Sequence, residues 1–349
     1  MRPRRRVDVM RPRRLRLLLA ALGGLAAASC DSPQNYLMHT GGRAAGWIAW
    51  LGWEAIIAFC AATLVTWGLL LWFALRRRGT LAEHAPIDIN SGQAWILIGG
   101  FLVPLGVLIW LFAGMLDLMV SLPMGHPATQ TPDIVITGQQ WWWEAVYRFK
   151  DRPNLSLHTA TEIHVPVGRP VNIEVQSADV MHSFWVPKLH GKIDLVPGLK
   201  NFIRVEATRP GTYLGQCASY CGEEHANMRL RVIAQTPRDY AAWLAHQRAN
   251  AAAPLNPETL RGQQVFLEAA CSLCHTVRGT PALADIGPDL THLASRQTIA
   301  GGMLVNNTAN LEAWVTHAQS LKPGTPMPDL PEFHGSDLRA LVTYLQTLK

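Results

Sequence analysis

The sequence predicts a multidomain membrane protein made of a two-helix transmembrane hairpin, an all-β domain and a small all-α domain, in that order. Three observations predict this fold class. Charge-free apolar runs at 55–75 and 94–116 are each long enough to cross a bilayer core. Short β-branched runs separated by Gly and Pro follow between residues 131 and 237. Helix patterns with capping residues then occupy residues 257–349.

The positive charge of the chain is concentrated at its N-terminus. The net charge is +6, but the first 16 residues hold eight Arg and one Asp, so the rest of the chain is slightly acidic. A basic segment before an apolar stretch is typical of a secretory signal, which we expect at residues 1–30. The segment Ala-Ala-Ser-Cys30 resembles a lipoprotein processing site, and cleavage near Cys30 without a lipid is the alternative. No basic face or motif remains for nucleic acid, which is excluded as a partner.

The hairpin is expected at residues 44–120, with both spans in the lipid bilayer. Three arginines at 76–78 directly follow the first apolar run. By the positive-inside rule they place the connection 76–93 in the cytoplasm. Everything from about residue 117 onward is therefore predicted to be extracytoplasmic.

The all-β domain at residues 131–237 carries a metal-ligand pattern. Strand patterns occur at 133–137, 162–166, 171–176, 202–206 and 230–233, which suits a Greek-key sandwich or barrel with ligands on its end loops. The pattern C-x3-C-x3-H-x2-M offers thiolate, imidazole and thioether ligands, the soft set that selects copper, with His182 as a distant partner. Zinc remains open on ligand type alone, and a disulfide is the alternative for the two cysteines. The pattern consists of Cys217, Cys221, His225 and Met228.

The all-α domain contains the attachment motif of a c-type haem. Residues 271–275 read Cys-Ser-Leu-Cys-His, in which Cys271 and Cys274 bind the macrocycle covalently and His275 is an axial ligand. Met327, held between two prolines, is the expected sixth ligand, and Met303 is the alternative.

Three helices are expected around this motif, at 257–269, at 310–320 and from an N-cap at Ser336 to residue 348. Together they suit a small class I cytochrome c. Residues 238–256 are interpreted as a linker between the two soluble domains.

Two segments, 179–187 and 217–228, resemble subunit II of the haem-copper cytochrome c oxidases. The resemblance implies a cupredoxin fold with a binuclear copper centre, called CuA. It implies that Cys217 and Cys221 bridge two coppers, that His182 and His225 each cap one, and that Met228 and the backbone carbonyl of Ser219 are weak ligands.

Residues 138–143 resemble the aromatic stretch that precedes the first strands of this family's domain. Trp141 matches the residue through which electrons enter, and ordinary aromatic packing is the alternative. The family usually has Glu at the position of Ser219, where it helps to hold magnesium. The substitution puts that magnesium site in doubt, although Asp194 still matches a polar position near the ion.

With its cytochrome domain, the chain resembles subunit II of the caa3-type oxidases. That implies electron transfer from haem c to CuA and on to haem a of subunit I, for reduction of oxygen to water coupled to proton translocation. The implied partners are subunit I (haem a, haem a3 and CuB), subunit III, and an electron donor such as cytochrome c or a quinol–cytochrome c reductase. The implied location is the bacterial inner membrane, multi-pass, with both soluble domains periplasmic.

No catalytic residue is expected in this chain, because neither apolar run holds the histidines that an oxygen-reducing centre needs. Three other functions fit the sequence less well. A copper-delivery module has no use for a fused haem. A quinol oxidase subunit II lacks the copper ligands, and nitrous oxide reductase joins its CuA domain to a His-rich propeller that is not present here.

Overall fold

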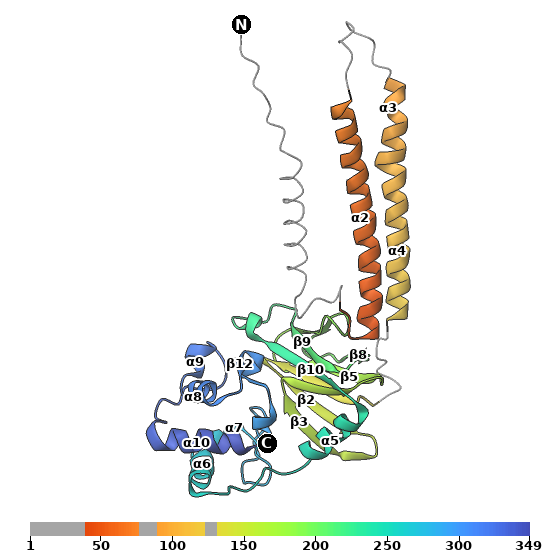
Figure 1. Ribbon diagram of the computed structural model, residues 1–349. Coiled ribbons are helices and arrows are strands. Elements are labelled where there is room, and N and C mark those ends of the chain that lie inside the picture. Colours follow the sequence, from red (N-terminus) through yellow and green to blue (C-terminus); the bar gives the residue numbers. More distant parts are fainter. Residues whose placement is uncertain (1–38, 77–88, 123–130) are drawn as a thin grey trace, which may run out of the picture.

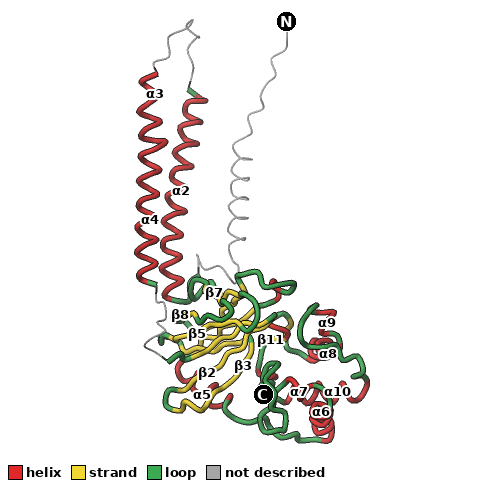
Figure 2. The backbone as a smooth tube through the Cα atoms, turned by 180° about the vertical axis from the view of Figure 1, so that it is seen from behind, coloured by secondary structure: helices red, strands yellow, loops and turns green. Residues whose placement is uncertain are grey.

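The computed structural model describes residues 39–76, 89–122 and 131–349. The expected signal segment with Cys30 lies outside the described residues. Figure 1 shows two long helices side by side above a β-sandwich, with a helical domain packed on another side of the sandwich. Figure 2 shows the same three parts from behind. The predicted fold class is confirmed.

The hairpin consists of α2 (Arg43–Leu75) and a second long helix. The latter is built from α3 (Ile89–Trp95), the π-helical η1 (Ile96–Leu102) and α4 (Val103–Ser121). Both helices are long and apolar enough to cross a membrane. Pro104 lies close behind the π-helical segment. Since Pro has no N–H to donate, a local change in helical hydrogen bonding is expected there.

Helix α2 begins well before the predicted span because its first turns pack on the sandwich. Ala45 and Ala49 are buried there. Gly42 N donates to Lys188 O at 2.9 Å, and Arg43 forms an ion pair with Glu206 at 2.9 Å. These contacts fix one end of the hairpin to the β domain.

The sandwich consists of two five-stranded sheets. Its apolar core lies between them, because alternate residues of each strand face inward. The first sheet has the order β3 (Arg152–Ala160), β2 (Trp142–Phe149), β1 (Ile134–Gln139), β5 (Val171–Ser177), β8 (Asn201–Val205). The second has the order β4 (Glu162–Pro166), β10 (Arg229–Gln235), β9 (Gly211–Cys217), β6 (His182–Trp185), β7 (Ile193–Leu195).

The tryptophan-rich segment 138–143 does not precede the strands. It forms the turn of the β1–β2 hairpin, in which Gln139 pairs with Trp142. Trp143 is fully buried and packs edge-on against Phe184, with 5.9 Å between ring centroids. The turn itself faces the helical domain.

The helical domain comprises α6 (Pro257–Glu268), α7 (Cys271–Cys274), α8 (Thr308–Thr316), α9 (Ala318–Leu321) and α10 (Gly335–Thr347), with a short pair of strands, β11 (Thr298–Ile299) and β12 (Leu304–Val305). Helices α6 and α10 cross closely at Gly262, where a Cβ would lie 2.0 Å from Ala340 O.

Two expectations about the helix bounds in this domain were wrong. The N-cap of α10 is His334 and not Ser336, and the helix expected at 310–320 breaks at His317.

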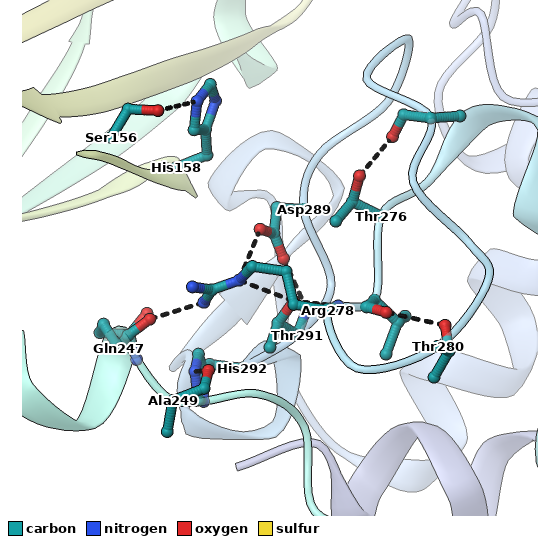
Figure 3. A network of polar contacts seen from close by, with 12 residues as sticks. Ser156, His158, Gln247, Ala249, Thr276, Arg278, Thr280, Asp289, Thr291 and His292 are labelled. Atoms are coloured by element: carbon teal, nitrogen blue, oxygen red, sulfur yellow. Dashed lines mark hydrogen bonds and ion pairs between the residues drawn. The ribbon is translucent and has the colours of Figure 1, made fainter. Parts of the chain in front are cut away.

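The segment between the two soluble domains contains α5 (Pro237–Gln247) and is anchored at both ends. On the sandwich side, Trp243 stacks on His164 with 4.0 Å between centroids. On the helical side, Arg278 donates to Gln247 O at 2.5 Å (Figure 3). The buried ring of His292 lies 3.1 Å from Ala249 O, which holds the end of the connecting segment on the helical domain.

Candidate functional site

Two thiols and two imidazoles converge at one end of the sandwich. Cys217 ends β9, Cys221 lies in the loop before β10, and His182 begins β6. One ligand atom from each of these three buried residues lies within 4.8 Å of the others. Cys217 Sγ is 3.9 Å from His182 Nδ1, and Cys221 Sγ is 3.5 Å from Nδ1 of His225. Strands that are far apart in the sequence therefore bring together the expected ligands.

The two weak ligands implied by the resemblance lie in the same cluster. Cys221 Sγ is 3.8 Å from Sδ of Met228, which is fully buried. Cys217 Sγ is 3.1 Å from the carbonyl oxygen of Ser219. Both cysteines are free thiols, and they form no disulfide with each other in the structure.

The two thiols cannot easily ionise together. The hydrogen bond that Cys221 donates to Cys217 lowers the pKa of Cys217 and raises the pKa of Cys221, because a second thiolate would face the first in a buried setting. A metal cation removes that repulsion by binding both sulfurs. Two thiolates, two imidazoles and a thioether fit soft metal ions, and five side chains exceed what one tetrahedral ion needs.

Asp179 is a site residue that the sequence reasoning missed. Its carboxylate lies 2.7 Å from His182 Nε2 and accepts a hydrogen bond from Gln140 N at 2.7 Å. This contact keeps the ring proton of His182 on Nε2. Nδ1 is then free to face Cys217, as is common for metal-bound histidines. The three-residue spacing between Asp179 and His182 was the available signal.

The magnesium position of the family has a different environment here. Asp194 forms an ion pair with Lys192 at 2.8 Å on the surface, and Lys192 lowers the pKa of this carboxyl. Ser219 provides a backbone oxygen to the thiol cluster but no carboxylate.

A second site is a cavity of about 360 Å³ in the helical domain. Its walls are mainly apolar and include Cys271, Cys274, His275 and Met327. The cavity therefore brings together the four residues expected to hold a haem. Met303 is not among its lining residues.

The environment of His275 suits an axial ligand. Its Nδ1 lies 2.8 Å from Pro288 O, which fixes the tautomer with Nε2 unprotonated. Burial lowers the pKa of His275, which keeps the ring neutral and able to bind a metal. Gly287 packs so closely against the ring that a Cβ there would lie 2.6 Å from His275 Cε1.

Two protein-family models match the two soluble domains of this chain. The cytochrome c oxidase subunit II periplasmic domain family matches residues 150–235, and the cytochrome c family matches residues 259–349. The β domain therefore contains a region similar to the periplasmic domain of cytochrome c oxidase subunit II, and we call it the subunit II domain. The helical domain is similar to cytochrome c, and we call it the cytochrome domain.

Two curated relatives show the extent of the similarity. Cytochrome c oxidase subunit 2 of Alkalihalophilus pseudofirmus is 42% identical over 216 residues, 62% of this chain and 61% of that protein. The corresponding subunit of Bacillus subtilis is 26% identical over 289 residues, 78% of this chain and 80% of that protein. The chain thus spans about three fifths of the first relative's length.

Among solved structures, the periplasmic domain of subunit II of cytochrome oxidase from Bradyrhizobium japonicum is 28% identical and covers 34% of this chain and 96% of that one. Its TM-score is 0.31. The match to a periplasmic domain and the two apolar helices fit a membrane protein with an extracytoplasmic domain.

The cavity of the cytochrome domain is closed by the subunit II domain. The β1–β2 turn supplies part of the wall through Gln139, Gln140, Trp141 and Trp142. The indole of Trp141 donates to Cys221 O at 3.0 Å, and Gln140 Nε2 donates to the same oxygen at 2.7 Å. One turn therefore touches the metal-ligand loop on one side and the cavity on the other.

Proposed function

We propose that this chain is subunit II of a caa3-type cytochrome c oxidase, an oxidoreductase and translocase that reduces oxygen to water and translocates protons. In this proposal electrons reach a covalent haem c, pass to CuA and continue to haem a of subunit I. The observation that carries the proposal is the shared turn: Trp141 lines the cavity of the Cys-x-x-Cys-His motif and bonds to the carbonyl of Cys221.

The expected copper ligands and the residues around them have distinct roles. Cys217, Cys221, His182 and His225 would hold a copper pair, with Met228 and the Ser219 carbonyl as weak ligands. Such a pair, when bound, supplies one-electron transfer with little change in geometry. Burial of Cys217, Cys221 and His182 and the Asp179–His182 contact favour this, because rigid surroundings keep the ligands in place.

In the cytochrome domain, Cys271 and Cys274 would form the thioether bonds, and His275 and Met327 would be the axial ligands. A haem, when bound, supplies the second one-electron centre. Gln319 Nε2 donates to Met327 O at 2.6 Å, which orients the loop that carries this methionine. Trp141 is 6% exposed and faces the cytochrome domain, so we assign it to transfer between the two centres within the chain.

The proposal implies partners and a location. Subunit I would carry haem a, haem a3 and CuB, and subunit III would complete the assembly. A cytochrome c or a quinol–cytochrome c reductase would supply electrons. The assembly would lie in the bacterial inner membrane, with the copper and haem domains in the periplasm.

The test is metal and haem analysis of the purified complex, with spin-resonance and near-infrared spectra. We expect a mixed-valence copper pair and one covalent haem from this chain. Cys221→Ser should abolish the copper-pair signal and leave the haem c spectrum unchanged. The matched control is Cys60→Ser in α2, an exposed free cysteine outside both sites, which should change neither spectrum. A wild-type protein without the mixed-valence signal would refute the proposal.

A further inference from the structure

Two buried charges cross the boundary between the subunit II domain and the cytochrome domain. Lys322 of the cytochrome domain is 1% exposed, and Glu162 of the subunit II domain is 2% exposed. Charged side chains are rarely this buried unless their hydrogen-bonding groups are satisfied. Glu162 is satisfied by groups of the opposite domain, and Lys322 by two groups of the opposite domain and one of its own.

The ammonium of Lys322 binds main-chain oxygens. It donates to Trp141 O at 2.8 Å and to Asn227 O at 3.2 Å in the subunit II domain, and to Ala300 O at 3.0 Å in its own domain. Trp141 is the turn residue between cavity and thiol cluster, and Asn227 directly precedes Met228. Burial lowers the pKa of Lys322 to about 8, so the side chain is charged at neutral pH.

The carboxylate of Glu162 makes the reciprocal contact. It accepts from Gln297 N at 2.8 Å, from Thr298 N at 3.0 Å and from Thr298 Oγ1 at 3.1 Å. All three donors belong to the cytochrome domain, in and next to β11. Each domain therefore inserts one charged group among polar groups of the other.

The glycines of the cytochrome domain confirm how closely the two surfaces meet. Gly301 has a positive φ of 70°, and a Cβ there would lie 2.4 Å from Trp141 O and 2.5 Å from Lys322 Nζ. A Cβ on Gly324 would lie 3.1 Å from Cη2 of the Trp141 ring. The backbone of the cytochrome domain approaches Trp141 where no side chain fits.

In any other docked arrangement, each buried charge would lose the partners that compensate its burial. A charge that stays buried without its partners is strongly unfavourable, so these contacts favour a single arrangement. A flexible linker alone raises the encounter frequency of two domains but fixes no orientation. The two contacts therefore select one docked orientation.

From these contacts we infer that Lys322 and Glu162 are positioning residues that lock the cytochrome domain on the subunit II domain, so that electron transfer between the two centres occurs in one fixed geometry through Trp141. This inference rests on the proposed function. Its structural half, the locked interface, can be tested without it.

The experiment uses the assembled oxidase that contains the full chain. The variants are Lys322→Met, which keeps the length of the side chain, and Glu162→Gln, which keeps its shape. The matched controls are Lys349→Met and Glu268→Gln, at exposed positions of the cytochrome domain. After rapid reduction of the haem, oxidation of the haem and reduction of the copper pair are followed by absorption.

We expect haem-to-copper transfer to slow about tenfold or more in both variants, because small displacements of reacting centres have large effects on rate. The haem and copper spectra should be unchanged, and the controls should transfer at the wild-type rate. Hydrogen exchange at residues 297–299, which contain the Glu162 donors, should be fast in the variants and slow in the wild type.

Two results would overturn the inference. One is a transfer rate within twofold of wild type in a Glu162→Gln protein whose haem and copper spectra are intact. Because Glu162→Gln is a conservative change, this measurement can be made even if Lys322→Met does not fold. The other is unprotected exchange at 297–299 in the wild type. Failure of the proposed function looks different: the wild type would lack a copper-pair signal while the exchange protection at 297–299 persisted.

Discussion

Lowering the pH from 7 to 5 should loosen α5 from the sandwich through His164. The ring of His164 stacks on Trp243 with 9° between planes, and its Nδ1 lies 2.9 Å from Oε1 of Gln235. Burial lowers the pKa of His164 to about 4, and the bond to Gln235 offsets only part of that effect. At pH 5 the ring is therefore neutral when α5 is docked and protonated when it is exposed.

The sign and size follow from these pKa values. Between pH 6.5 and 4 the exposed state binds more protons than the docked state, so docking is fully stable above pH 6.5 and weakens as the pH falls. Taking 6.5 for the exposed ring and about 4 for the docked one, the loss between pH 7 and pH 5 is at most about 2 kcal/mol. That corresponds to roughly a twentyfold change in the opening equilibrium.

Hydrogen exchange of the α5 amides, corrected for the intrinsic effect of pH, measures this equilibrium. We expect protection to fall about twentyfold from pH 7 to pH 5 in the wild type. In His164→Gln, whose amide still donates toward Gln235, protection should not change. His158→Gln is the control, and its α5 protection should fall with pH as in the wild type. The contact with Glu144 raises the pKa of His158, so this histidine stabilises the folded state at low pH, opposite to His164. Equal losses in wild type and His164→Gln would refute the reasoning.

Three further predictions concern the two sites. Asp179→Asn should weaken copper binding about 10- to 100-fold, measured by competition with a chelator, because the orienting partner of His182 is lost; an unchanged affinity would contradict it. Gly287→Ala should displace His275 and alter the haem spectrum, since the new methyl group would lie 2.6 Å from Cε1 of the ring. Met327→Ala should allow carbon monoxide to bind the haem, which is measured by absorption. A variant haem that does not bind carbon monoxide would favour Met303 as the sixth ligand.

Local spacing explains why most of the candidate site could be predicted. Cys217, Cys221 and His225 lie within nine consecutive residues, and the haem motif lies within five, so one loop or one helical turn can bring the groups of each motif together. His182 is different, because only the pairing of β6 with β9 brings it to Cys217. Local spacing gives no support for including it, and the structure places it within reach of the thiols.

Several strands gave no clear signal in the sequence. Strand β9 contains two glycines among its seven residues, which weakens a strand pattern, yet Gly215 is needed because a Cβ would lie 2.8 Å from Trp185 O. In β2 the tryptophans conceal an ordinary alternation in which Trp143, Ala145 and Tyr147 face the core. In both cases tertiary packing, and not local propensity, decides the structure.

The interface could not have been predicted from local pattern at all. Lys322 follows a short polar helix and has the sequence context of a surface lysine; its burial depends on Trp141, 181 residues earlier in the chain. Glu162 begins a strand, where an exposed carboxylate would be unremarkable. Burial of these two charges results from contacts between two domains, so no periodicity within one domain can indicate it.

The anchored connector and the buried charges have different consequences for transfer between the domains. Helix α5 limits how far the cytochrome domain can move, which sets how often the two surfaces meet. Lys322 and Glu162 determine the orientation once they meet, because their hydrogen-bonding partners coincide in one arrangement only. Lengthening the connector should therefore change the transfer rate little while both charges remain. The same insertion should slow transfer markedly in Glu162→Gln, where docking depends more on encounter frequency.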